Sequence, residues 1–184
     1  MARLTADDWI RAATIQLANG GIETVRVERL AKALKVSKGS FYWHFEDRQA
    51  LLTAILEAWE QQGTLQIIET VDREASAPAE RLWALFQQVF GGPLEFDAVE
   101  AAMRAWAAVA PQVKRVVRRV DRQRLSYVVE LLVAAGIPGD EAKRRSELLY
   151  CTLMGEFLQR TYGKARLGQQ ALRSFHAMML MPGS

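Results

Sequence analysis

Two short helical periods separated by a tight break constrain the fold of this chain more than any other feature. Within residues 24–51, apolar side chains recur at the i, i+3, i+4 and i+7 spacing of a helix at Val27, Leu30, Ala31 and Leu34. The period breaks after Leu34, and Ser37 stands where it can cap a second helix over residues 38–45. Two short helices joined by such a turn predict a helix-turn-helix.

The second helix is expected to bury Phe41 and Phe45, which lie at i and i+4 and so share one face. The other face then carries Lys38, Ser40, Tyr42, Trp43 and His44. Hydroxyls, ring N–H groups and an ammonium group at a helix N-terminus can reach phosphates and base edges in a DNA major groove. The alternative is a helical hairpin whose aromatic side chains fill a core.

A local basic cluster favours the DNA-binding interpretation over the hairpin. Its members are Arg26, Arg29, Lys32, Lys35 and Lys38, with Glu28 as the acidic residue among them. Attraction to phosphate depends on such clustering more than on the charge of a whole chain. The formal net charge of +3 fits a nucleic-acid partner without requiring one.

The order of residues from Val36 to Phe45, followed by Glu46-Asp47-Arg48 and Leu51-Leu52, resembles the signature of the TetR family, V-S-x-G-T-L-Y-x-H-F-x-S-K-x-x-L. The resemblance is close over residues 1–60 and concerns only the architecture beyond them. It implies DNA contacts from Arg26, Lys38, Gly39, Ser40, Tyr42, Trp43, His44 and Arg48.

Two of these positions depart from the usual family pattern. The family usually has Thr or Ser, as a helix cap, where this chain has Arg26, and Lys where it has Arg48. Arginine cannot cap a helix in that way but can reach a phosphate, and Arg48 keeps the positive charge. Thr24 is an alternative start for the first helix of the motif.

Local signals place further helices on both sides of the motif. Thr5 and Asp8 predict a capping box, and Gly20-Gly21 predict the end of that first helix. Asp47 is expected to cap a fourth helix with the broad apolar face Leu51, Leu52, Ile55, Leu56 and Trp59. The predicted organisation is a helix-turn-helix domain over residues 1–46, a connecting helix region over 47–70, and an effector-binding and dimerisation domain over 71–184.

The remainder of the chain reads as a helical bundle. Breaks occur at Gly91-Gly92-Pro93, at Pro111 and at Gly136-Ile137-Pro138, after which Asp140 is expected to cap a long helix. We find no convincing strand. The sequence therefore predicts an all-α fold of about nine helices, in which a three-helix head is joined by a fourth helix to a C-terminal bundle.

The resemblance implies a homodimer formed through two long helices, here residues 111–135 and 140–162, and a small-molecule site within the bundle. Large apolar side chains with a few hydroxyl and indole donors are proposed for that site: Trp83, Phe86, Phe90, Met103, Trp106, Tyr127, Tyr150 and Phe157. The alternative is that they are ordinary core. The second long helix is apolar on more than one side and needs a second cover, and the proposed interface residues are Leu131, Tyr150, Met154 and Leu158.

A basic run, Arg118, Arg119, Arg122 and Arg124, follows Lys114 and Arg115 on the first of these long helices. A solvated face or ion pairs explain most such runs. An intersubunit salt-bridge network and a site for an acidic effector are the alternatives.

The residues present exclude several other classes of function. A single cysteine and two histidines argue against a disulfide framework and a metal site. There is no nucleophile motif, no phosphate-binding loop, no leader-like segment and no long apolar run. We therefore expect a cytoplasmic protein that is not an enzyme and needs no cofactor.

The function predicted from these observations is a dimeric, ligand-responsive transcriptional regulator, most simply a repressor. It is expected to bind a palindromic operator in double-stranded DNA and a small, largely apolar effector. One alternative is a DNA-binding dimer without a small-molecule effector, either constitutive or controlled by a protein. Another is a helical binding module that no longer recognises DNA.

Overall fold

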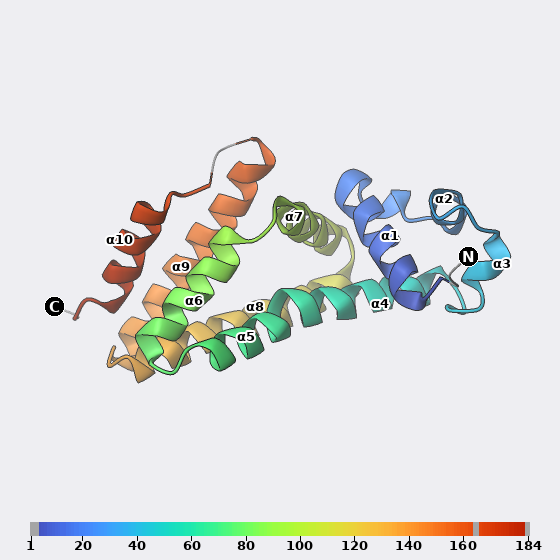
Figure 1. The fold of residues 1–184 in the computed structure, drawn as a ribbon. Helices are drawn as coiled ribbons and strands as arrows, with labels where there is room; N and C mark the ends of the chain where they lie inside the picture. The colour runs from blue at the N-terminus through green and yellow to red at the C-terminus, as the bar shows by residue number, and fades with distance from the viewer. Residues whose placement is uncertain (1–3, 164–165, 183–184) are drawn as a thin grey trace. The chain divides into compact units, whose positions relative to one another are not determined.

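The computed structural model describes residues 4–163 and 166–182, and its secondary structure is entirely helical within these ranges. The helices follow in the order α1 Ala6–Gly20, α2 Val27–Ala33, α3 Lys38–Phe41, α4 Arg48–Glu60, α5 Gln66–Glu74, α6 Pro78–Gly91, α7 Leu94–Val109, α8 Pro111–Ala134, α9 Gly139–Thr161 and α10 Gln169–Leu180 (Figure 1). The π-helical segment Gln61–Leu65 joins α4 to α5 without a break. The predicted all-α fold is confirmed.

The chain divides into two compact units. One comprises the chain up to Gln61 together with residues 98–117, and the other comprises residues 62–97 and the chain from Arg118 onward. Most of α7 and the start of α8 therefore group with the N-terminal helices, which no sequence signal indicated. The domain boundaries expected near residues 46 and 70 stay predictions.

Two helix starts agree with the sequence in atomic detail. The Thr5 N–H donates to Asp8 Oδ2 over 2.8 Å while the Asp8 N–H donates to Thr5 Oγ1 over 3.3 Å, which is the predicted capping box of α1. Gly21, at φ 73°, ends the same helix. The Ala50 N–H donates to Asp47 Oδ1 over 2.7 Å and caps α4. Both caps depend on residues that are close in the sequence, which is why they could be predicted.

The second helix of the motif is shorter than predicted, and its predicted N-cap residue makes no capping bond. Helix α3 ends at Phe41, and residues 42–44 form a hydrogen-bonded turn in which the His44 N–H donates to the Phe41 carbonyl over 2.9 Å. Ser37 occupies the N-cap position, but within the described chain its side chain makes no capping hydrogen bond. The segment is held in place by the burial of Phe41 rather than by a cap.

The alternative start of α2 at Thr24 and the expected Asp140 cap of α9 are not found. Helix α2 begins at Val27, and the Thr24 hydroxyl donates to the carbonyl of Gln16 over 2.7 Å, so Thr24 closes the loop after α1 instead of starting α2. Helix α9 begins at Gly139 with Pro138 in the cap position, so Asp140 lies in the first turn. There its carboxylate interacts favourably with the helix dipole but does not cap a backbone N–H.

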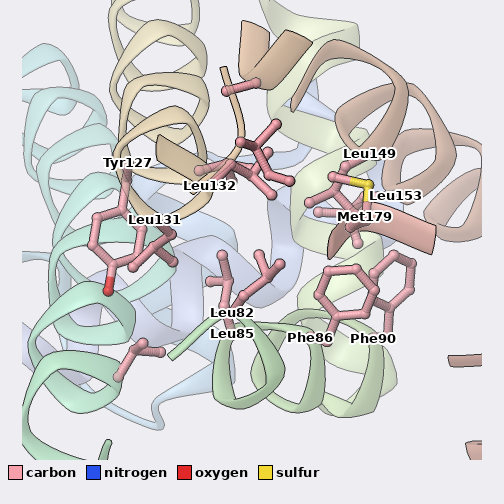
Figure 2. Close-up of a cluster of buried hydrophobic side chains, with 14 of the residues drawn as sticks. Leu82, Leu85, Phe86, Phe90, Tyr127, Leu131, Leu132, Leu149, Leu153 and Met179 are labelled. Atoms are coloured by element: carbon pink, nitrogen blue, oxygen red, sulfur yellow. The ribbon is translucent and has the colours of Figure 1, made fainter. Parts of the chain in front are cut away.

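The second unit has a continuous apolar core. Its buried members are Val71, Leu82, Leu85, Phe86, Phe90, Tyr127, Val128, Leu131, Leu132, Ile137, Ala142, Leu149, Leu153, Leu172 and Met179. Figure 2 shows the rings of Phe86 and Phe90 side by side, with centroids 5.4 Å apart. Helices α5, α6, α8, α9 and α10 each contribute, so this core fixes most of the unit.

A buried ion pair lies beside that core. Arg160 of α9 donates from Nη2 to Asp97 Oδ1 over 2.7 Å and from Nη1 to the Phe90 carbonyl over 2.9 Å. The two charged side chains are 0% and 4% exposed. Burial raises the pKa of Asp97 above its ordinary value, and Arg160 opposes that rise.

The π-helical turn between α4 and α5 is held by an arginine of the basic run. Arg124 donates from Nε to Thr64 Oγ1 over 2.9 Å and from Nη2 to the Gly63 carbonyl over 3.2 Å. One member of the run therefore has a structural role, because a π-helical turn leaves carbonyls that need donors. Across the described residues, no helix is both long and apolar enough to cross a membrane.

Candidate nucleic-acid interface

A buried aromatic contact anchors the helix-turn-helix. Phe41 of α3 is 0% exposed and meets Trp9 of α1 edge-to-face, with ring centroids 5.3 Å apart. Phe45 stacks on Phe41 from the following turn at 5.5 Å. Leu17 of α1 and Leu30 of α2 are also fully buried. Because these contacts fix Phe41, they also fix the direction of the side chains on the opposite side of α3.

The turn between α2 and α3 contains a strained residue. Lys35 has φ 57°, a left-handed conformation that a side chain with a Cβ adopts at a cost. The Val36 N–H donates to the Ala31 carbonyl over 2.9 Å and closes the turn behind it. The turn therefore sets the angle between α2 and α3. A lysine at position 35 did not indicate this left-handed backbone conformation.

The predicted outward residues lie together on α3 and the turn after it. Tyr42 is 60% exposed and Trp43 is 78% exposed, and Lys38 is exposed as well. Ser40 and His44 are half-buried. Large aromatic surfaces are seldom left in water without a purpose. The exposure expected for Tyr42, Trp43 and Lys38 is confirmed, and their role in DNA contact stays a prediction.

Gly39 has no evident structural reason to be glycine. A Cβ built on it would lie 3.7 Å from Ser37 Oγ, an ordinary van der Waals distance. Its backbone is within a helix, so no positive φ requires glycine either. Glycine also serves where another backbone or a ligand must approach closely, and this use fits the position at the exposed start of α3.

The two arginines expected to contact phosphate bond to backbone carbonyls. Arg26 Nε donates to the Glu23 carbonyl over 2.9 Å. Arg48 Nε donates to the Val25 carbonyl over 2.6 Å, and its Nη2 donates to the Ile22 carbonyl over 2.9 Å. The Arg48 guanidinium thus joins the start of α4 to the loop before α2. Sequence reasoning missed this role because backbone acceptors leave no mark on residue types.

Comparison with known proteins identifies this head. Residues 10–55 match the family described as bacterial regulatory proteins, tetR family. The class E tetracycline repressor protein of Escherichia coli is 38% identical over 58 residues, which are 32% of this chain and 28% of the repressor. The head belongs to the TetR family. The likeness in sequence spans little more than a quarter of that curated relative, so it concerns the head.

Solved structures extend the likeness in fold from the head to nearly the whole chain. A transcriptional regulator, TetR family, from Agrobacterium tumefaciens has a TM-score of 0.74 at 20% identity and covers 95% of both chains. A transcriptional regulator from Saccharomonospora viridis, solved in complex with choline, has a TM-score of 0.72 at 14% identity, over 95% of this chain and 92% of that one. At these identities the likeness shows the fold alone.

The side chains expected to line an effector site fall into both units. Met103 and Trp106 belong to the first unit, where both are buried. The others, Trp83, Phe86, Phe90, Tyr127, Tyr150 and Phe157, belong to the second. Of these, Phe86, Phe90 and Tyr127 are buried in its core, and Trp83 and Phe157 pack against it.

The polar groups of the two tyrosines among them are already engaged. The Tyr127 hydroxyl donates to Asp72 Oδ1 over 2.7 Å, and burial together with this bond raises the pKa of Tyr127. The Tyr150 hydroxyl donates to Asp121 Oδ1 over 2.5 Å. An effector could use either hydroxyl only as an acceptor or by displacing the carboxylate.

The expected interface residues differ in exposure. Leu131 is 5% exposed and lies in the core of its own chain, and Met154 packs partly against that core. Tyr150 is half-buried, whereas Leu158 is 54% exposed. One side of α9 presents an uncharged stripe at i, i+3, i+4 and i+7 spacings. Its exposed members are Leu148, Cys151, Thr152, Leu158 and Gln159, with the half-buried Gly155 among them and the exposed Tyr162 at the C-cap.

Proposed function

We propose that this TetR-family chain regulates transcription by binding duplex DNA with α3 in the major groove. The observation that carries the proposal is the exposure of Lys38 on α3 and of Tyr42 and Trp43 in the turn that follows it, next to the buried Phe41. Tetracycline repressors share this head at 38% identity, which supports repression as the direction of control. A positively charged, aromatic helix face suits both phosphate and base-edge contacts.

Substitution of the outward residues tests the proposal. Tyr42→Ala and Lys38→Ala should weaken binding to DNA fragments selected from the source genome while leaving helicity unchanged. If Lys38 contacts a phosphate, its loss should also flatten the log–log salt dependence of binding, by up to about 0.9 unit. Phe96→Ala is the control, since Phe96 is also aromatic, is 48% exposed, and lies outside both the head and the α9 stripe. Equal DNA affinity in all four proteins would contradict the proposal.

We infer further that the chain acts as a homodimer on a palindromic operator. The uncharged stripe of α9 supports this inference, because Leu148 at 65% and Leu158 at 54% exposure are unusual on a helix otherwise rich in charge. The same uncharged stripe on a second copy of the chain could pack against it and remove both from water. Two heads related by a twofold axis would then meet two half-sites of opposite orientation.

We also propose a small, largely apolar effector that weakens operator binding. Two observations support it: the aromatic side chains gathered around Phe86, and the choline bound to the Saccharomonospora viridis protein of the same fold. Linkage requires that an effector which lowers operator affinity by some factor binds less tightly to the operator complex by the same factor. Calorimetric titration with and without operator tests this equality, and an effector indifferent to operator would contradict the proposal.

A DNA-binding dimer without an effector is the second candidate. The burial of Phe86 and Met103, both 0% exposed, favours it, since such residues are already satisfied as core. A screen of metabolites and drugs against the protein–operator complex separates the two candidates. Release of operator by a compound supports the first, and the absence of any release across the screen supports the second.

A further inference from the structure

An ion pair connects the two helices of the motif. Lys38 is the first residue of α3 and Glu28 lies in the first turn of α2, and the Nζ and Oε1 atoms of this pair are in direct contact. The side chains are 54% and 63% exposed, so the pair lies at the surface. The bond to Lys38 lowers the pKa of Glu28, and the bond to Glu28 raises the pKa of Lys38. Both groups are therefore charged at neutral pH.

Glu28 is the wrong charge for a surface that meets DNA. Arg29 and Lys32, on the same helix, are exposed and basic, as phosphate attraction requires. A carboxylate in the first turn of α2 does stabilise the helix through its interaction with the helix dipole. That benefit is available to Glu28 without any partner on α3, so it does not explain the direct bond to Lys38.

We propose that Glu28 is a positioning residue that competes with DNA phosphate for Lys38 and thereby limits the affinity of the head for DNA of any sequence. This inference rests on the proposed function, because it requires the head to bind DNA. In the free protein Glu28 holds the Lys38 ammonium over the junction of α2 and α3. When Lys38 bonds to a phosphate it must leave Glu28, and the freed carboxylate then lies close to the DNA backbone.

The competition has a predictable size and a predictable salt dependence. Exposed ion pairs are weak, so removing this one should raise DNA affinity by about two- to fivefold. Each phosphate contact adds about 0.9 to the slope of log K against log salt. An ammonium already neutralised by Glu28 contributes less than this, since the freed carboxylate takes up a cation on binding. Without Glu28 the slope should be steeper by up to about 0.9.

The experiment measures binding of a short fluorescein-labelled duplex of mixed sequence by anisotropy at several salt concentrations. The proteins are the full-length wild type, Glu28→Gln, Lys38→Gln, the double variant, and Glu23→Gln. Glu23 is an exposed carboxylate of the same head, so Glu23→Gln changes the net charge equally without touching Lys38. Circular dichroism verifies that all five proteins are equally helical.

The proposal expects Glu28→Gln to bind more tightly and with a steeper salt slope than Glu23→Gln. It also expects Lys38→Gln to lower affinity by a larger factor in the Glu28→Gln background than in the wild type. Equal effects of Glu28→Gln and Glu23→Gln, or a Lys38→Gln effect that is the same in both backgrounds, would overturn it while leaving the proposed function intact. A wild type that binds no duplex even at low salt would overturn both.

Discussion

The Arg48 Nε–H group donates a hydrogen bond of 2.6 Å to the backbone carbonyl of Val25. A second bond of 2.9 Å runs from Nη2 of the same side chain to the Ile22 carbonyl. Arg48 is the first residue of α4, and both acceptors lie in the loop between α1 and α2. This arrangement uses the fixed fork of a guanidinium, which an ammonium group cannot reproduce.

Arg48→Lys should therefore lower the free energy of unfolding, by about 1 kcal/mol, although the charge is kept. Arg29→Lys, at an exposed arginine of α2, is the matched control and should be nearly neutral. Urea denaturation followed by tryptophan fluorescence measures both. If Arg48 acts mainly on phosphate, Arg48→Lys would keep its stability, and Arg48→Met would lose DNA affinity without loss of stability.

The sequence predicted those features of the head that depend on neighbouring residues. The Thr5–Asp8 capping box, the Asp47 cap and the outward direction of Tyr42 all follow from spacings within one helical turn. It did not predict the role of Arg48, because the acceptors are main-chain atoms 23 and 26 residues away. It also missed Trp9, whose contact with Phe41 joins helices that are distant in the sequence.

In the second unit, the sequence did not predict which side chains distant along the chain contact one another. The Gly and Pro breaks at residues 91–93, 111 and 136–138 located the ends of its helices. The bond between Arg160 and Asp97 spans 63 residues, and many other arginines and carboxylates could have been paired instead. The exposed side of α9 was also not predicted, since a helix that is apolar on more than one side does not reveal which of these sides its own chain covers.

Lys35→Gly should stabilise the protein. Lys35 has φ 57°, where a Cβ costs energy and glycine does not. After the larger entropy loss of glycine, a net gain of roughly 0.5 kcal/mol is expected in the free energy of unfolding. The control Lys32→Gly removes the same charge from the regular helix α2 and should destabilise the protein by about 1 kcal/mol. Denaturant titration distinguishes the two, and a loss of stability in both would contradict the strain at Lys35.

Arg160→Met should destabilise the second unit by about 3–5 kcal/mol at neutral pH, because it leaves the buried Asp97 carboxylate without its partner. The double variant Asp97→Leu/Arg160→Met should be milder, since it leaves no buried charge. Arg173→Met, at an exposed arginine, is the control. Thermal unfolding measures the series, and equal losses for Arg160→Met and Arg173→Met would show that the buried pair contributes nothing.

The same pair gives a pH dependence with a defined sign. Burial raises the pKa of Asp97 above its ordinary value of 3.8. The folded chain then holds a proton that the unfolded chain has released, so the contribution of Asp97 to stability falls as pH rises from about 4 through the raised value. Asp97→Asn removes this dependence. Parallel stability–pH curves for wild type and Asp97→Asn above about pH 4 would contradict the shift.

Leu148→Glu should dissociate the proposed dimer without unfolding the chain. Leu148 is 65% exposed in the single chain, so the carboxylate is solvated in a monomer but buried without a partner in a dimer formed through the α9 stripe. Val109→Glu, at a 75% exposed residue outside the stripe, is the control. Met154→Glu should instead lower the free energy of unfolding, since Met154 packs against the core. Sedimentation at micromolar concentration measures dimerisation of each variant. A Leu148→Glu protein that dimerises as tightly as wild type would exclude the α9 stripe as the dimer interface.

Gly39→Ala should move stability and DNA binding in opposite directions. The new Cβ meets only an ordinary contact with Ser37 Oγ at 3.7 Å, and alanine loses less entropy than glycine in a helix, so the free energy of unfolding should rise by up to about 0.5 kcal/mol. If Gly39 is where the DNA backbone approaches α3, the same methyl group meets a phosphate or sugar and weakens binding to every duplex. Gly91→Ala, whose Cβ would also meet open space, is the control for a change that stabilises a helix away from the head. Anisotropy titration and denaturant unfolding on the same samples test both parts, and a Gly39→Ala protein that is more stable and binds DNA as tightly as wild type would remove Gly39 from the interface.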